Sequence, residues 1–384
     1  MNKCLWCVIL NLLLVESCNF SQINKDEDIT CINWDSLKDA DYLQHPYTQI
    51  HFVKLETNEN CILNEVEKIE TDDSLIFIED NMQRLYVFNI EGTYVRKIGN
   101  KGGSENEYIT LFDFVLNRAD KKLYIVDGSR ARVLTFNYCG DYLGYKDICE
   151  ESLSDAVKLV YADERNLVTL NFNSPDERFN FSVVDLKHKR VTNQIEYLSV
   201  GKNRYHSDKG RSTYHSPEIL VCAELSDTIY SLEKEKITPK YVFQGITRHA
   251  TKDDIDDGVY EFGIQACNDL LGKGISPGID NLYGTDNILY FQYKTRDGYY
   301  RIFYNTCTKA GCKFDMTKEL DAANNLLWNY LITASNDAFL CVLPIGDFLD
   351  AEGVRKSYVK LDSLLKKSNE EDNPIIAYFT ENVQ

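Results

Sequence analysis

The feature that most constrains this chain is a repeat of short strand-like segments separated by turns. One block runs over residues 74–99 and a second over residues 122–147; each combines a Leu-Tyr strand, a turn, a Gly-x-Tyr segment and an outgoing strand. The two Gly-x-Tyr segments begin at Gly92 and Gly140, an offset of 48 residues. A period of about 40–50 residues built from strands is typical of β-propeller blades. More divergent blocks follow at residues 158–186, 219–246, 282–316 and 327–343.

Six such blocks predict an all-β, six-bladed β-propeller with one or two short peripheral helices. Alternate residues in 123–126 (LYIV) point to opposite faces and all are apolar. Strands buried on both sides fit blades stacked face to face, because a single blade cannot cover its own faces. The strand HFVKL (51–55) lies outside the six blocks. We expect it to complete the last blade and close the ring.

Two segments have helical patterns. Residues 251–271 begin with Thr251, which suits an N-cap, and continue with acidic first turns. Residues 357–367 place apolar side chains near helical spacing and end in lysines. We expect these two segments to form the peripheral helices.

The first 17 residues have the pattern of an export signal. Lys3 precedes an apolar stretch of about eleven residues, which is shorter than the roughly 20 that a membrane-spanning helix needs. The stretch ends in Val-Glu-Ser-Cys, which resembles a bacterial lipobox with lipid on Cys18; simple secretion with cleavage nearby is the alternative. Such lipid anchors a protein to a membrane surface without spanning it. We therefore predict a lipoprotein signal peptide (1–17), a tether and N-terminal segment (18–45), a propeller (46–384) and a cell-envelope location.

The net charge and the spacing of the cysteines argue against two classes of function, nucleic-acid binding and a zinc ribbon. The net charge of −18 opposes binding to phosphate backbones, so no nucleic-acid partner is expected. The chain after Cys18 has no Cys-x-x-Cys pair and hence no zinc-ribbon spacing. Cys307 and Cys312 flank a four-residue turn between strand-like segments, where a disulfide can form. Two free, half-buried thiols are the alternative.

Several motifs identify a family resemblance. Asp127 followed by Arg132, Val133 and Phe136 is similar to the NHL-repeat pattern, and residues 99–108 form a glycine-rich loop that ends in Glu-Tyr. With the segments 227–230 and 372–376, they make the chain resemble the six-bladed β-propeller lipoproteins of Bacteroides-type bacteria, relatives of NHL and TolB-like propellers. The resemblance implies the fold and says little about activity, because propellers host many functions.

Three motifs favour structural interpretations. Asp127 and Arg132 are expected to form an ion pair inside a blade and not a ligand pair. Residues 274–278 match G-x-S-x-G, but Pro277 lacks the N–H that an oxyanion hole needs and no strand precedes it. The acidic run at residues 253–258 places isoleucine where a calcium loop needs ligands, so no metal site is predicted.

The segment 201–216 is the candidate binding loop. It carries cationic and aromatic side chains in an otherwise acidic chain, a combination that suits an anionic sugar or the carboxylates of a partner. A solvated loop without function is the alternative. The candidate residues are Lys202, Arg204, Tyr205, His206, Arg211, Tyr214 and His215.

From these observations we expect a binding or scaffolding module for a glycan, a peptide or an envelope protein, without a cofactor and without an assigned catalytic residue. One alternative is an enzyme of the lactonase or lyase type with a metal in the central channel. Its ligands would come from the innermost strand of each blade. A purely structural component of the envelope is a third hypothesis.

Overall fold

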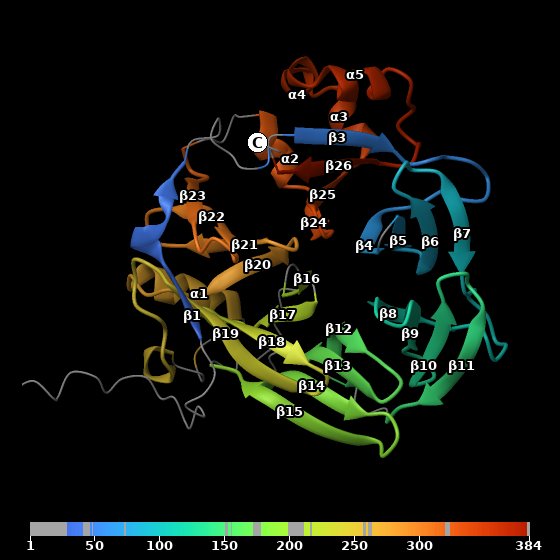
Figure 1. Ribbon diagram of the computed structural model, residues 1–384, viewed down its shortest axis with the longest axis horizontal. Helices are drawn as coiled ribbons and strands as arrows, with labels where there is room; N and C mark the ends of the chain where they lie inside the picture. Colours follow the sequence, from blue (N-terminus) through green and yellow to red (C-terminus); the bar gives the residue numbers. More distant parts are fainter. Residues whose placement is uncertain are drawn as a thin grey trace, which may run out of the picture.

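The described part of the chain forms six small β-sheets arranged as a ring around a central axis (Figure 1). In the computed structural model the described residues are 29–40, 47, 49–72, 74–149, 153–154, 156–171, 178–198, 211–215, 217–255, 259, 263–318 and 323–381. Each sheet packs its apolar faces against the two neighbouring sheets. The predicted six-bladed β-propeller is therefore confirmed.

The first three blades are regular antiparallel sheets whose strands follow one another in sequence from the axis outward. Blade 1 contains β4 (Val66–Asp72), β5 (Leu75–Asp80), β6 (Arg84–Asn89) and β7 (Tyr94–Ile98). Blade 2 contains β8 (Leu111–Asn117), β9 (Lys122–Asp127), β10 (Arg132–Asn137) and β11 (Tyr142–Asp147). Blade 3 contains β12 (Ala156–Ala162), β13 (Asn166–Asn171), β14 (Phe179–Asp185) and β15 (Arg190–Glu196).

The last three blades each recruit a strand from the beginning of the chain. Blade 4 contains β16 (Ser212–His215), β17 (Glu218–Cys222), β18 (Thr228–Glu233) and β19 (Lys236–Gln244), with β1 (Thr30–Asn33) added. Blade 5 contains β20 (Ile279–Gly284), β21 (Ile288–Lys294), β22 (Tyr299–Asn305) and β23 (Gly311–Asp315), with β2 (Lys38–Asp39) added. Blade 6 contains β24 (Leu331–Ala334), β25 (Ala338–Leu343), β26 (Ile375–Thr380) and β3 (Gln49–Lys54).

The N-terminal strands line the outer edges of these three blades. β1 pairs in parallel with β19 and β2 pairs in parallel with β23, whereas β3 pairs antiparallel with β26. Strand β3 contains most of HFVKL, so the expected closure of the last blade by this segment is confirmed. Covering the outer edges protects backbone groups that would otherwise be free to pair with another chain.

A single amide side chain joins the last blade to the first. The Asn373 amide donates to the carbonyl oxygens of Glu56 (2.6 Å) and Cys61 (2.7 Å), and its oxygen accepts from the Leu63 N–H (2.8 Å). Asn373 is almost completely buried. It therefore fixes the segment that leads from blade 6 into blade 1.

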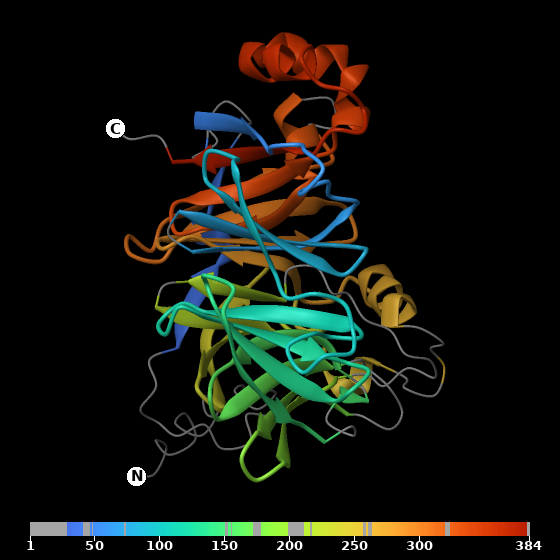
Figure 2. The same ribbon diagram turned by 90° about the vertical axis from the view of Figure 1, so that its right-hand side faces the viewer.

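The described residues contain five short α-helices, more than the one or two expected. α1 (Gly263–Gly272) lies between blades 4 and 5 and α2 (Ala323–Trp328) lies before blade 6. α3 (Ile345–Leu349), α4 (Glu352–Ser357) and α5 (Val359–Leu365) are inserted between β25 and β26 and stand outside the ring (Figures 1 and 2). None of the helices in the described residues is long and apolar enough to cross a membrane.

The predicted helix over residues 251–271 is shorter than expected, while the one over 357–367 is confirmed as α5. Thr251 caps a 3-10 turn (Lys252–Asp254), and Ile255 is already extended. The carboxylate of Asp254 accepts from the Thr251 N–H (2.8 Å) and from both ends of the Arg248 guanidinium (2.6 and 2.7 Å). These bonds close the turn, and the α-helix begins at Gly263.

Candidate functional site

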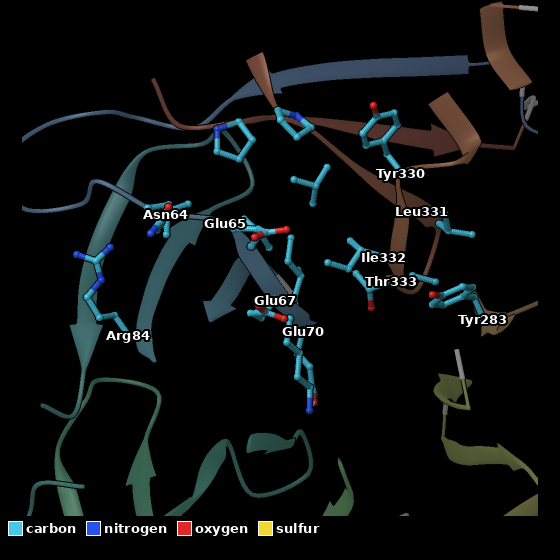
Figure 3. Close-up of a pocket in the computed structure, with 18 of the residues that line it drawn as sticks. Asn64, Glu65, Glu67, Glu70, Arg84, Tyr283, Tyr330, Leu331, Ile332 and Thr333 are labelled. Atoms are coloured by element: carbon cyan, nitrogen blue, oxygen red, sulfur yellow. The ribbon is translucent and has the colours of Figure 1, made fainter. Parts of the chain in front are cut away.

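The central channel of the ring contains a cavity of about 1220 Å³. The innermost strand of every blade contributes to its lining, as expected for the channel of a propeller. Residues 62–67, 344–347, 370–372 and 374, from the segments beside blades 1 and 6, also line the cavity, and we call this part its mouth. Figure 3 shows acidic side chains of β4 on one wall and side chains of β20 and β24 on the opposite wall.

On the wall formed by blades 1–3, a buried lysine holds the inner strands together. Lys68 Nζ donates to Asp113 Oδ1 (2.8 Å) and lies 3.3 Å from Glu70 Oε1. The other oxygen of Asp113 accepts from the Leu159 N–H (2.6 Å). Burial works to lower the pKa of Lys68, but Asp113 and Glu70 outweigh it and leave the pKa raised. The lysine is therefore charged at neutral pH, and it connects three consecutive blades.

An arginine continues this network to the end of the channel. Arg118 follows the last residue of β8, donates from Nε to the Thr71 carbonyl oxygen (3.0 Å) and lies 3.4 Å from Glu70 Oε2. Its guanidinium also stacks on the ring of Tyr214, at 4.3 Å from the ring centroid. Because Tyr214 belongs to blade 4, this cation–π contact bridges the channel from blade 2.

A third carboxyl group lies next to Lys68, on the neighbouring strand. Glu79 is directly opposite Lys68 in the pairing of β4 with β5 and is 8% exposed. Burial first, and the neighbouring Asp113 carboxylate second, raise the pKa of Glu79 to about 9. The group is therefore protonated at neutral pH, which limits the negative charge packed around Lys68.

The opposite wall, from blades 5 and 6, is neutral. It presents Tyr283 together with Leu331, Ile332 and Thr333 of β24 (Figure 3). Tyr330 stands at the mouth, where its hydroxyl donates to Asp347 Oδ2 (3.0 Å). This wall offers aromatic and aliphatic surface with hydroxyl groups.

The mouth of the channel carries an excess of negative charge. Seven carboxylates and four cationic side chains line the cavity. Three of the cations, Lys68, Arg84 and Arg118, have carboxylate partners in the structure. The exposed acids at the mouth are Glu65, Glu67, Asp347, Glu370 and Glu371. The apolar side chains of Ile62 and Met82 are exposed beside them.

The predicted binding loop is only partly described. Lys202, Arg204, Tyr205 and His206 lie outside the described residues. Arg211, Tyr214 and His215 are described, and they are not on a surface loop: residues 212–215 form β16, the innermost strand of blade 4. Tyr214 faces the channel, so one of the predicted residues belongs to the site.

The two other described residues of this segment are buried for structural reasons. Arg211 is 6% exposed and lies 3.4 Å from Asp280 Oδ1. The His215 ring bonds through Nδ1 to the Thr285 carbonyl oxygen, and burial lowers the pKa of this histidine. Both side chains therefore connect blade 4 to blade 5.

Cys307 and Cys312 are free thiols in the structure instead of the predicted disulfide. Cys312 lies in β23 opposite Phe303, whereas Cys307 lies beyond the end of β22, in the turn. The Cys307 thiol donates to Asn287 Oδ1 (3.3 Å). The two cysteines thus do not occupy facing positions of the hairpin. Cys18 lies outside the described residues.

Two of the motifs interpreted as structural make contacts inside the fold, and the expected ion pair between Asp127 and Arg132 is present. Arg132 Nε lies 3.5 Å from Asp127 Oδ2, and Asp127 also accepts from the N–H groups of Ile109 and Thr110. Ser276 is buried and its hydroxyl donates to Asp227 Oδ1 (3.1 Å). The other oxygen of Asp227 bonds to the His249 ring, so the serine hydroxyl donates to the carboxylate and not directly to the histidine.

Among the residues that the structure describes, no three or more His, Cys, Asp or Glu side chains are arranged to hold a metal ion. Sequence reasoning missed Lys68, Glu70, Asp113 and Arg118. The available signal was a set of charged residues inside otherwise apolar strands, at Lys68, Glu70 and Asp113.

Comparison with known proteins places the chain in a family. The model of a family described as "Domain of unknown function (DUF4934)" matches residues 28–380. No curated protein matches the chain. A crystal structure from Bacteroides fragilis, named "Putative exported protein", is similar with a TM-score of 0.67 and 20% identity, covering 92% of this chain and 100% of that one. At this identity the likeness shows the fold.

Two more distant solved structures also match. A member of the DUF4221 family from Bacteroides vulgatus gives a TM-score of 0.48 at 10% identity, covering 88% of this chain and 97% of that one. A catalytically inactive virginiamycin B lyase from Staphylococcus aureus, solved with quinupristin, gives 0.35 at 11% identity, covering 69% and 74%. Neither likeness is close enough to carry an argument about this chain.

Proposed function

The chain belongs to the DUF4934 family, and we propose that it is a binding module of the cell envelope whose central channel takes up a ligand with cationic groups. The observation that carries the proposal is the open cavity of about 1220 Å³ bordered by all six blades. Concave sites of this size that combine apolar walls with a few placed polar groups are the usual binding sites of proteins.

The charge at the mouth supports the ligand class. Glu65 and Glu67 are exposed at the start of β4, and no ion-pair partner among the described residues neutralises either one. Glu370 and Glu371 face the mouth from blade 6. Ammonium or guanidinium groups are attracted by such a mouth, and the faces of Tyr283 and Tyr330 offer cation–π contacts further along. A peptide or protein segment with lysine or arginine side chains can both be attracted by the acidic mouth and make the cation–π contacts.

Binding of hexalysine tests the proposal, with hexaglutamate as the control for charge. We expect hexalysine to bind and hexaglutamate not to bind by calorimetry at low ionic strength. Replacing both Glu65→Gln and Glu67→Gln should weaken hexalysine about fivefold or more, since two exposed charge pairs are lost. The matched control replaces Glu91→Gln and Glu196→Gln, two exposed acids on outer strands or turns. Equal weakening by both double variants would place the ligand outside the channel.

Export and lipidation are part of the same proposal. The apolar leader and the lipobox-like segment before Cys18 support it, and so does the name of the Bacteroides fragilis protein of similar fold. Metabolic labelling with palmitate tests it: the wild-type protein should incorporate the label, and Cys18→Ser should not. Secretion of an unlabelled wild-type protein would instead support cleavage without lipid.

A further inference from the structure

We propose that a basic groove on the outer rim, between blades 2 and 3, binds a sulfate or phosphate ester group. The groove is separate from the central channel and has a volume of about 430 Å³. Four cationic and two anionic side chains line it, although the chain as a whole has a net charge of −18. Its lining residues are Lys146, Asp147, Glu164, Arg165, Leu186, Lys187 and Lys189.

The hairpin turn between β14 and β15 forms one wall. Residues 187–190 read Lys-His-Lys-Arg and all four are exposed. The nearby carboxylate of Asp185 faces inward: its oxygens accept from the N–H groups of Lys187 (2.9 Å) and His188 (3.0 Å) and contact the His188 ring (2.8 Å). That carboxylate therefore shapes the turn, while the basic side chains project from it.

The fold itself does not require cations at this turn. In blade 1 the equivalent turn is closed by the Asn89 side chain, which accepts from the Thr93 N–H (2.8 Å). In blade 2 the Asn137 side chain accepts from the Asp141 N–H (2.9 Å). Blade 4 alternates glutamate and lysine over residues 233–236 at the same place. A run of four basic residues is thus peculiar to blade 3 among these turns.

The other wall leaves a guanidinium facing the groove. The Leu186 N–H donates to the Arg165 carbonyl oxygen (2.7 Å), which holds Arg165 beside the hairpin turn. No described residue forms an ion pair with the Arg165 side chain. Glu164, the acid next to it, already binds Lys122 (2.6 Å) and Lys146 (3.4 Å). Asp147 is the second acid of the lining, so cations remain in excess.

This set of donors fits a tetrahedral oxyanion. An arginine fork binds two oxygens of a sulfate or phosphate group, and lysines add point charges around it. The same ester group occurs on anionic polymers and on lipid headgroups, and its chemistry is what the groove recognises. Because the rest of the protein is acidic, binding at the groove depends strongly on ionic strength.

Two probes distinguish these sources: soluble dextran sulfate, and vesicles of phosphatidylcholine with about 30% phosphatidylglycerol. The purified protein should bind at least one of them at about 50 mM salt and release it as the salt rises. The double variant Lys187→Glu with Lys189→Glu should weaken that binding about tenfold or more. Binding of dextran sulfate assigns the group to a polymer, and binding of the vesicles assigns it to a headgroup.

The matched control is Lys356→Glu with Lys360→Glu, two exposed lysines of α4 and α5. It changes the net charge equally and should leave binding within about twofold. Arg165→Gln, which keeps the hairpin turn intact, should weaken binding independently, and circular dichroism of each variant verifies folding. Absence of binding to both probes, or equal losses in the groove and control variants, would overturn the proposal. Hexalysine binding should be unaffected by the groove variants, so this test stands apart from that of the channel.

Discussion

The two halves of the ring are joined by different chemistry. Blades 1–3 meet at the axis through charged groups, with Lys68, Asp113 and the Leu159 N–H linking one blade to the next. Blades 5 and 6 meet through aromatic rings: Trp328 stacks on Tyr290 at 5.7 Å and lies 4.6 Å from Phe379, measured between ring centroids. The same four-stranded blade is thus compatible with both kinds of interface.

This difference between the two halves indicates which part of the ring can offer groups to a ligand. The aromatic packing between blades 5 and 6 is dense and buries the rings of Trp328 and Tyr290. Charged side chains on the innermost strands need partners of opposite charge. Those partners also lie near the axis, where they line the channel. The half of the ring that contains the ion pairs at the axis is also the half with the exposed acids Glu65, just before β4, and Glu67, in β4. The stability of the two halves should therefore respond differently to mutation and to pH.

The largest effect is expected in the aromatic half. Trp328→Ala removes a fully packed side chain and should lower the free energy of unfolding by about 3–5 kcal/mol. The loss should be the same at pH 6 and pH 9, since no charge is involved. Urea unfolding measures it, with Leu326→Ala on the same helix as the control because Leu326 is 38% exposed. A loss that varied with pH would contradict the assignment of this half to apolar packing.

A somewhat smaller effect is expected in the charged half. Lys68→Met keeps the aliphatic chain but leaves the buried Asp113 without its cation and Glu70 with Arg118 alone, which should lower the free energy of unfolding by about 3 kcal/mol. The control is Lys121→Met. Lys121 also forms an ion pair, with Asp72, but 49% of its side chain is exposed. That variant should lose less than about 1 kcal/mol. Similar losses in both variants would show that burial of Lys68 adds nothing.

Glu79 should make the stability of the charged half depend on pH. Its pKa of about 9 lies above the value of an unfolded glutamate, so the folded state holds a proton that the unfolded state has released. Stability from this group therefore falls as the pH rises from about 4.5 to 9, by at most about 1.4 kcal/mol per unit. Glu79→Gln should flatten this slope and raise the melting temperature at pH 8. An unchanged pH profile would contradict the buried, protonated state.

The smallest effect is expected at an ion pair on the rim between blades 4 and 5. His249 Nδ1 bonds to the carboxylate of Asp227, and this hydrogen bond raises the pKa of the histidine. A raised pKa means that the stabilisation is complete below about pH 6.5 and is lost as the pH rises through the folded-state pKa. Because His249 is 43% exposed, solvent screens the pair. His249→Gln should lower the melting temperature slightly at pH 5.5 and leave it unchanged at pH 9.

Many strands of the ring could be predicted because their sequence patterns lie within short segments of the chain. Residues 74–99 and 122–147 carry apolar strands and Gly-x-Tyr turns whose signals do not depend on the rest of the chain. β16 could not be predicted, because it is a strand of only four residues, most of them polar. It forms a strand by pairing with β17. β15 was missed for a similar reason: it is an exposed outer strand without apolar alternation.

The channel itself could not be predicted from the sequence. Arg118 and Tyr214 lie in different blades and meet only because the ring closes. Likewise, burial between blades is the main cause of the raised pKa of Glu79, and Asp113 from the neighbouring blade adds to it. Contacts across the axis have no periodic signature in a sequence, so the charged candidates of segment 201–216 were more conspicuous than the residues that line the cavity.

The N-terminal strands have a consequence for how the protein is made. Thr30 pairs with Tyr241, Lys38 with Cys312 and Gln49 with Thr380, so the earliest residues of the ring await partners that are synthesised much later. Contacts so distant in sequence form slowly, because a large loop must be closed first. A nascent chain can assemble blade 1 before these edges exist. Deleting residues 29–40 should therefore leave the early blades able to fold while exposing the rims of blades 4 and 5 to aggregation.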